Sequence, residues 1–341
     1  MKRYILHIIA ALALLILSYL AHRLPRITPD ELAIVSLLFG FFVALRGLEN
    51  SGVLEVVAAK TERGNMAAAQ LVAATYLLAL FVTNDVALLS LVPLALRMNL
   101  ATPQRVVALM AIAANAAALF PFSNPQNLFI YWRYRLDFVE FVQSIAPFSL
   151  TLFALALLFS LRCAAKVSQK PPQPTFNRSK ALLWGGLFGL AVLAVVRIAP
   201  VWSAWLPVLA ALFVERRALR VDYGLLALFL LLFAVGDLAG ELLERFLAHP
   251  HHAFLLTVTL SQIAGNVTAA VVVSDLGAPP QAVLWGANVG GYGALWSSFA
   301  TLIAYRLCAE RCGDGVWREF AGLGLLALAV GAGLYFLLIS F

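Results

Sequence analysis

The chain has 341 residues, of which 62% are hydrophobic and only 12% are charged. Soluble globular domains carry about 25% charged residues, and apolar runs long enough to cross a bilayer recur along this chain, so the composition excludes a soluble protein and predicts a polytopic α-helical membrane protein. The net charge of +7 fits basic loops that face the cytoplasm better than it fits nucleic-acid binding.

The first half of the chain is predicted to contain an N-terminal transmembrane helix and a first repeat. The helix lies within residues 1–30 and is expected to be retained, because its apolar core is longer than that of a signal peptide. The repeat covers residues 31–161 and contains four hydrophobic segments: 31–47, 67–97, 104–136 and 140–161. Polar residues interrupt two of these segments, one at Thr83-Asn84-Asp85 and the next near Pro121–Asn127.

The second half follows a basic linker. Residues 162–180 contain basic residues and prolines but no acidic residue, which indicates a cytoplasmic loop. Residues 181–221 are predicted to form a connecting helical hairpin, and residues 222–341 a second repeat. Its hydrophobic segments are 222–236, 253–276, 280–307 and 319–340. We interpret the polar-faced stretch after the first of them as a separate interfacial helix, and we expect interruptions near Gly265–Thr268 and Asn288–Gly293.

The basic residues also predict how the segments cross the membrane. Lys2 and Arg3 place the N-terminus in the cytoplasm. Counted back from the linker, segment 67–97 begins and ends on the cytoplasmic side, which predicts a re-entrant hairpin with its tip at the Thr-Asn-Asp interruption. Segment 253–276 is predicted to be a second re-entrant hairpin that enters from the opposite side.

An internal repeat supports this layout. When residues 113–141 are aligned with residues 286–307, Ala114-Asn115 matches Ala287-Asn288. Inverted repeats with paired interrupted helices are typical of secondary transporters that bind their substrate at the membrane midplane. The predicted fold is an all-α polytopic membrane protein with two inverted-topology repeats, each with a re-entrant helical hairpin and a broken transmembrane helix.

The four interruptions form the predicted substrate- and ion-binding site. Non-helical backbone at membrane depth is tolerated where it is buried in protein or lines a wet cavity. Half-helix N-termini suit an anion, whereas half-helix C-termini and free carbonyls suit Na⁺ or a proton-bearing group. The predicted site residues are Thr83, Asn84, Asp85, Ser123, Asn124, Asn127, Gly265, Asn266, Thr268, Asn288, Gly290 and Gly291. A Na⁺ is expected near Asn84 and Asn266, and helix packing is the alternative role for any single asparagine or glycine.

Asp85 is the charged residue of the hairpin tips. A charge at the bilayer centre costs roughly 2.5–3.5 kcal/mol, so Asp85 requires a partner or a proton and is predicted to couple H⁺ or Na⁺. Two other aspartates are given peripheral roles. Asp275, at the outer end of the second hairpin, is expected to be solvated, and Asp237 is expected on the polar face of the interfacial helix.

The interrupted motifs resemble those of a known superfamily. FVTNDVALLSLVP, SNPQNLFIY, SQIAGNVTAAVVVSD and GANVGGYGALWSSFATLIAY are similar to the hairpin tips and broken helices of the ion transporter superfamily, in particular its citrate-transporter-like and arsenical-pump-like permeases. The resemblance implies two inverted repeats, a homodimer and an elevator-like movement. Dicarboxylate carriers of the superfamily use paired Ser-Asn-Thr tips. Only Asn84 and Asn266 match them here, and Asp85 favours proton coupling or a cationic or neutral substrate.

The sequence therefore predicts an ion-gradient-driven secondary transporter of the inner (cytoplasmic) membrane that moves a small anion or oxyanion-like solute, such as a carboxylate or arsenite. The expected partners are that solute, the lipid bilayer and a second copy of the chain. No cofactor beyond the coupling H⁺ or Na⁺, no nucleic acid and no enzymatic activity are expected, because no catalytic motif is found. A Na⁺/H⁺ exchanger on the same architecture is the main alternative, and a channel is another.

Overall fold

The computed structural model describes residues 5–54, 56, 66–98, 100–163, 176–247, 249–313 and 315–339. These residues form helices joined by short connections and contain no β-strand, so the predicted all-α class is confirmed. Most of the basic linker, residues 164–175, lies outside the described residues.

The helices follow the predicted hydrophobic segments closely. Those of the first half are α1 (Ile5–Ala21), α2 (Pro29–Asn50), α4 (Ala67–Phe81), α5 (Asn84–Arg97), α6 (Pro103–Ala116), α7 (Pro125–Arg133) and α8 (Phe138–Ser160). Those of the second half are α9 (Arg178–Val195), the 3₁₀ helix η2 (Val201–Trp205), α10 (Leu206–Phe213), the 3₁₀ helix η3 (Arg216–Leu219), α11 (Tyr223–Leu247), α12 (Pro250–Ala264), α13 (Asn266–Asp275), α14 (Pro280–Gly290), α15 (Phe299–Cys312) and α16 (Val316–Ile339).

Five helices in the described part of the chain are long and apolar enough to cross a membrane. They cover Pro29–Asn50, Phe138–Ser160, Arg178–Val195, Arg216–Leu238 and Val316–Ile339. A helix needs about 20 apolar residues to cross the hydrocarbon core. The paired helices α4 and α5, α6 and α7, α12 and α13, and α14 and α15 are each shorter than this, because polar residues interrupt the hydrophobic segments that contain them.

Local sequence explains where several helices begin. Proline stands in the first turn of α2, α6, α7, α12 and α14, where its missing N–H group costs nothing and its fixed φ favours the helix. Asn124 caps α7, since its side chain accepts a 3.0 Å hydrogen bond from the Asn127 N–H group. The first broken helix is therefore interrupted at residues 117–124. Pro125 begins α7, whereas the sequence placed it in the unwound segment.

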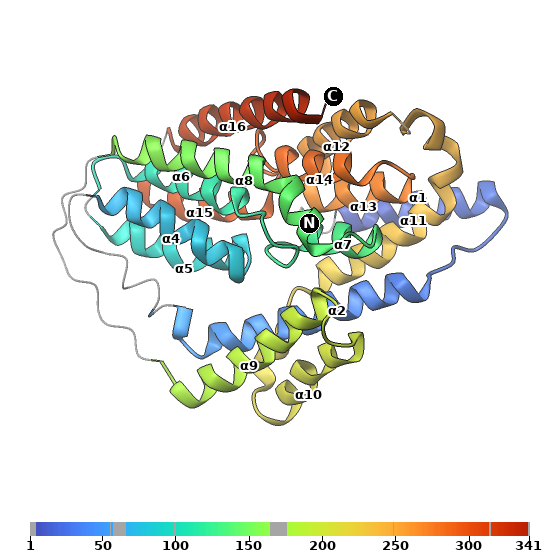
Figure 1. Cartoon of the computed structure of the whole chain (residues 1–341), viewed down its shortest axis with the longest axis horizontal. Helices are drawn as coiled ribbons and strands as arrows, with labels where there is room; N and C mark the ends of the chain where they lie inside the picture. The colour runs from blue at the N-terminus through green and yellow to red at the C-terminus, as the bar shows by residue number, and fades with distance from the viewer. Residues whose placement is uncertain are drawn as a thin grey trace.

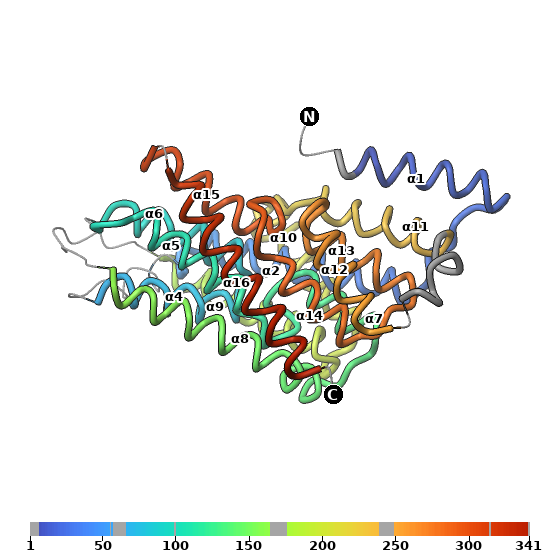
Figure 2. The backbone as a smooth tube through the Cα atoms, turned by 90° about the horizontal axis from the view of Figure 1, so that it is seen from above, coloured from blue at the N-terminus to red at the C-terminus, as the bar shows by residue number. Residues whose placement is uncertain are grey.

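The helices pack in groups (Figure 1). Helices α4, α5, α6, α8 and α15 lie against one another, and α16 contacts α6 and α8. Helices α12, α13 and α14 form a second group, in which α13 also packs on α11. Helix α2 packs with α9, η2, α10 and η3 along the lower edge of Figure 1. Helix α1 lies along α11 at one side of the molecule, as Figure 2 shows.

Two parts of the second half differ from the prediction. Helix α11 continues unbroken to Leu247, so the polar-faced stretch is not a separate helix. Asp237 within it accepts hydrogen bonds from the Arg23 guanidinium group and from the Arg26 N–H group, which ties the end of α1 to α11. The second broken helix is interrupted at residues 291–298, between α14 and α15. Asn288 still belongs to α14, so the interruption begins later than the predicted Asn288–Gly293.

The close contact between α2 and α9 depends on a glycine. A Cβ atom added at Gly47 would overlap the ring of Trp184, and Trp184 is completely buried. A larger residue at position 47 would therefore have to displace the ring or separate the two helices.

Candidate functional site

The two hairpins turn at residues that share an unusual backbone conformation. Thr83, which precedes α5, has φ 137° and ψ 152°, and Gly265, which precedes α13, has φ 87° and ψ 153°. Positive φ is free of strain for glycine but costly for threonine. Each turn leaves the first N–H groups of the following helix without helical partners.

Asparagine is the first residue of the helix after each turn, and it is 5% exposed in both hairpins. Asn84 Nδ2 donates a 3.1 Å hydrogen bond to Asn115 Oδ1 in α6, and Asn84 Oδ1 accepts from the Asp85 N–H group at 3.1 Å. In the second hairpin, the Asn266 N–H group donates to the Ser297 carbonyl at 2.8 Å. Each tip is therefore held against a broken helix.

The two broken helices are linked by a reciprocal pair of asparagine contacts. Asn115, near the end of α6, donates to Thr301 Oγ1 at 2.9 Å and accepts from Ser298 Oγ at 2.7 Å, both at the start of α15. Asn288, near the end of α14, donates to Asn127 Oδ1 at the start of α7 at 2.8 Å. Asn115 and Asn288 are aligned in the internal repeat. In each broken helix, the first half therefore contacts the start of the second half of the other broken helix.

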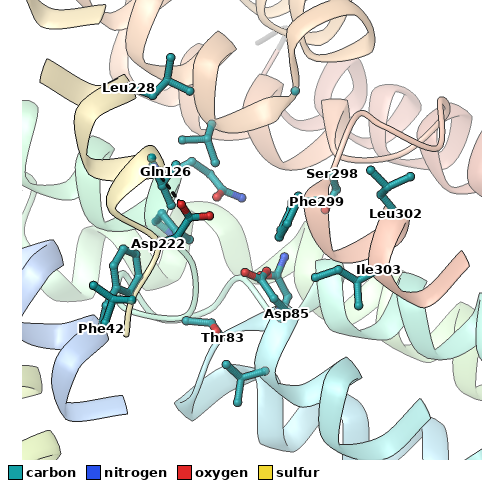
Figure 3. Close-up of a pocket in the computed structure, with 18 of the residues that line it drawn as sticks. Phe42, Thr83, Asp85, Gln126, Asp222, Leu228, Ser298, Phe299, Leu302 and Ile303 are labelled. Atoms are coloured by element: carbon teal, nitrogen blue, oxygen red, sulfur yellow. Dashed lines mark hydrogen bonds between the residues drawn. The ribbon is translucent and has the colours of Figure 1, made fainter. Parts of the chain in front are cut away.

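A cavity of about 390 Å³ lies between the two hairpin tips. The residues that begin four helices line it: Thr83, Asn84 and Asp85 at α5, Pro125 and Gln126 at α7, Gly265, Asn266, Val267 and Thr268 at α13, and Ser298 and Phe299 at α15. Figure 3 shows side chains from three of these helix starts around the cavity, with Asp85, Gln126 and Phe299 among them. Helix N-termini carry partial positive charge and free N–H groups. The arrangement therefore suits a small anion, and the cavity is large enough for one.

Residues from three other parts of the chain complete the cavity lining. The charged ones are Arg46 and Glu49 of α2 and Arg220 and Asp222 before α11, and His7 of α1 lies beside them. Arg46 Nη1 donates to Glu49 Oε2 at 2.7 Å, and His7 Nε2 lies 2.8 Å from the Gly224 carbonyl oxygen. Together with Asp85, the cavity presents three carboxylates and two guanidinium groups.

Half of the predicted site residues line this cavity, namely Thr83, Asn84, Asp85, Gly265, Asn266 and Thr268. Ser123, Asn124, Asn127 and Asn288 do not, and their side chains bond within the protein. Asn127 and Asn288 bind each other, Asn124 caps α7, and Ser123 Oγ donates to the Phe120 carbonyl at 2.7 Å. These four side chains shape the broken helices around the cavity.

The two predicted glycines lie beside the cavity lining and serve close packing. A Cβ atom added at Gly290 would lie 2.6 Å from Ser261 Cβ, so glycine allows α14 to approach α12. At Gly291 it would lie 3.0 Å from Asn266 Nδ2. Gly291 therefore leaves room for the asparagine of the second tip.

Gln262 holds the second unwound segment in place, and it is not among the predicted site residues. Its Nε2 donates to the Gly290 carbonyl at 2.8 Å, and its Oε1 accepts from the Ala294 N–H group at 2.8 Å. Its own carbonyl accepts from the Trp296 indole at 2.7 Å. The signal that identified the tips, a polar residue inside an apolar run, also applies to Gln262. Asn115 stands in the repeat alignment but is also not among the predicted site residues.

Sequence comparison identifies the family. The profile described as "Citrate transporter" matches residues 2–286 of the chain. The chain belongs to the citrate transporter family. Among its relatives is "Inner membrane protein YbiR" of Escherichia coli K12, with 31% identity over 306 residues that cover 83% of this chain and 81% of that protein. Another is "Uncharacterized transporter MJ0456" of Methanocaldococcus jannaschii, with 29% identity over 246 residues and 68% coverage of each chain.

Membership of the citrate transporter family confirms the predicted superfamily. Together with the long apolar helices of the described part, this membership shows that the chain is a multi-pass membrane transporter. The names of the family and of its relatives indicate transport and not an enzymatic reaction, as the sequence predicted.

Proposed function

We propose that this protein is a secondary transporter that moves a small anion, a carboxylate or an oxyanion-like solute, across the cytoplasmic membrane at the expense of an ion gradient. The observation that carries this proposal is the cavity between the two hairpin tips, which the starts of four helices line. A helix N-terminus stabilises a nearby anion by roughly 0.3–1 kcal/mol at exposed sites and by up to about 2 kcal/mol when partly buried. Four such termini favour an anionic solute over a cationic one.

Asp85 is the proposed coupling residue. It begins α5 at the cavity, next to Asn84, and its carboxylate makes no ion pair with any other described residue. A carboxylate at this depth needs a compensating cation or a proton. A bound H⁺ or Na⁺ would remove the repulsion between Asp85 and an anionic solute, so cation and anion would bind together. Na⁺ would take its oxygen ligands near Asn84 and Asn266.

The proposed topology places the N-terminus in the cytoplasm and the two repeats in opposite orientations, with each hairpin re-entering the membrane. In the proposed repeats, α2 and α5 correspond to α11 and α13. Helix α13 packs closely on α11, whereas α5 does not pack in this way on α2. The cavity lies between α2 and α5. Since Arg46 and Asp222 fall at helix ends assigned to the cytoplasm, the cavity faces the cytoplasm in this arrangement. A second copy of the chain would provide the fixed frame for movement of the hairpins.

A Na⁺/H⁺ exchanger is the second candidate, and one observation favours it. Asp85, Glu49 and Asp222 all line the same cavity, and several carboxylates around one cavity suit a cation better than an anion. In an exchanger, Na⁺ and H⁺ would compete for Asp85 and no organic solute would be needed.

A ligand screen on the purified protein separates the two candidates. A solute that binds the native state raises its melting temperature, and a concentration of 100 Kd corresponds to about 2.7 kcal/mol of stabilisation. We expect a carboxylate or oxyanion to raise the melting temperature, and Na⁺ or low pH to enhance its effect. Stabilisation by Na⁺ alone, with no response to any anion across a broad panel, would support the exchanger instead.

A further inference from the structure

Asp275 is a buried carboxylate outside the central cavity. It ends α13, and its side chain is only 3% exposed, so the expectation of a solvated aspartate is wrong. Its Oδ1 accepts a 3.1 Å hydrogen bond from Arg133 Nε at the end of α7. Arg133 is itself 41% exposed and contacts the carboxylate through this single N–H group, so the pair is not the bidentate arrangement that best compensates a buried charge.

The second carboxylate oxygen of Asp275 is buried without a hydrogen-bond partner among the described residues. Helix α11 covers it at Gly236, where a Cβ atom would lie 2.5 Å from Asp275 Oδ2. Only a glycine therefore allows α11 to lie this close to the carboxylate. A buried ionised oxygen without a donor is costly, and protonation removes most of that cost.

The other polar groups around Asp275 do not supply the missing donor. Just after α7, the Tyr134 hydroxyl donates to the Ala278 carbonyl at 2.7 Å. From α11, the neighbouring Asp237 is engaged by Arg23. Glu31 of α2 contributes a further negative charge in the vicinity. Arg133 is thus the one cation in contact with Asp275 in the described part of the chain, and it serves the other oxygen.

We propose that Asp275 is a second proton-binding site, distinct from Asp85, and that its protonation closes the contact between α13 and α11. With a proton on Oδ2, the neutral acid packs against Gly236, and α13 and α11 stay in contact. When the proton leaves to water, the ionised carboxylate requires hydration, and α13 separates from α11. In the proposed topology this contact lies at the outer side, so external pH would bias the hairpin between its closed and open positions.

The contact can be tested by thiol labelling. In a background without the three native cysteines, Ala278→Cys places a thiol beside the contact at a position that is 2% exposed. Its rate of reaction with a membrane-impermeant maleimide is measured in vesicles at pH 5.5 and pH 8. Because thiol reactivity itself rises with pH, each rate is divided by that of the same protein carrying Asp275→Asn, an uncharged and similarly shaped side chain.

The ratio of the labelling rate with Asp275 to the rate with Asp275→Asn is expected to be near one at pH 5.5 and at least five at pH 8. A ratio within twofold of one at both pH values, or faster labelling of the Asp275→Asn protein, would overturn the proposal. If the amide variant is not recovered, Asp275→Ser provides the neutral reference with the same expectation. Labelling is read without any solute, so failure here leaves the proposed transport function intact, and failure of the solute screen leaves this result intact.

Gly236→Ala provides an independent check of the contact. Its Cβ atom cannot fit against Asp275, so the thiol should react rapidly at pH 5.5 as well as at pH 8. Gly186→Ala in α9 is the matched control, because a Cβ atom there meets nothing within 4 Å, and it should retain the protection at pH 5.5. Retained protection in the Gly236→Ala protein would contradict the assigned contact.

Discussion

The side-chain amide of Asn84 donates a 3.1 Å hydrogen bond to Oδ1 of Asn115, which joins the first hairpin tip to the first broken helix. The same Oδ1 accepts from Ser298 at 2.7 Å, and the Asn115 amide donates to Thr301 at 2.9 Å. One buried side chain thus connects the tip that carries Asp85 to the second broken helix. A shift of the tip relative to α15 must break or rearrange these bonds.

Asn115→Ala is therefore expected to impair transport. It leaves the Asn84 amide and the Ser298 hydroxyl without their acceptor, and an unsatisfied buried polar group costs about 1–3 kcal/mol. We expect a lower melting temperature and at least tenfold slower uptake in proteoliposomes. Asn177→Ala, which removes an exposed cap of α9, is the control and should keep full uptake. Normal uptake by the Asn115 variant would show that this junction is dispensable.

The contact between Asn127 and Asn288 is predicted to couple the two broken helices energetically. A double-mutant cycle with Asn127→Ala and Asn288→Ala isolates the pairwise term, and for residues in direct contact this term is typically about 0.5–3 kcal/mol. The cycle compares the unfolding free energies of the wild type, the two single variants and the double variant. Additive effects, with a coupling below about 0.3 kcal/mol, would mean that the bond contributes nothing to joining the two broken helices.

Asp85→Asn is expected to separate ion coupling from solute movement. The amide cannot carry the coupling proton or balance a Na⁺, so uptake driven by an imposed ion gradient should fall at least tenfold. Exchange of labelled for unlabelled solute at equal ion concentrations should continue, because the cavity and the helix N-termini persist. Asp85→Glu should recover part of the gradient-driven uptake. If gradient-driven uptake and its pH dependence are unchanged in the asparagine variant, Asp85 is not the coupling residue.

Gly47→Ala is predicted to destabilise the protein by about 1–3 kcal/mol, because its Cβ atom would overlap the buried ring of Trp184. Gly189→Ala, in the helix that carries Trp184, meets no atom within 4 Å and should be neutral or stabilising by up to about 1 kcal/mol. Melting temperatures of the two variants in one detergent provide the comparison. Equal melting temperatures would contradict the packing of α2 on α9.

The hairpin tips could be predicted from the sequence because a polar cluster inside an apolar run has few structural explanations. The exact bounds of the unwound segments could not be predicted in this way. Proline can lie in unwound backbone or begin a helix, and Pro125 does the latter after the cap provided by Asn124. Likewise, Asn288 still belongs to α14, and its side chain bonds the Leu284 carbonyl one turn earlier at 2.8 Å.

The charged part of the cavity could not be predicted in the same way. Glu49 and Asp222 fall near the ends of hydrophobic segments, where charged residues are ordinary, and His7 lies in an N-terminal helix with no repeat counterpart. Only the packing of α1 and α2 near the start of α11 brings these side chains to one space. The burial of Asp275 could not be predicted either, because Gly236, which packs against it, and Arg133, which pairs with it, are distant along the chain.

Solute binding to tip variants tests the central claim most directly. The anion that gives the largest thermal stabilisation is titrated calorimetrically into the wild type, the Asn84→Ala/Asn266→Ala double variant and the Asn177→Ala control. If the cavity between the tips is the transport site, the double variant should bind at least 30-fold more weakly, while the control binds as the wild type does. Unchanged affinity in the folded double variant would contradict the claim that the transported anion binds between the two hairpin tips.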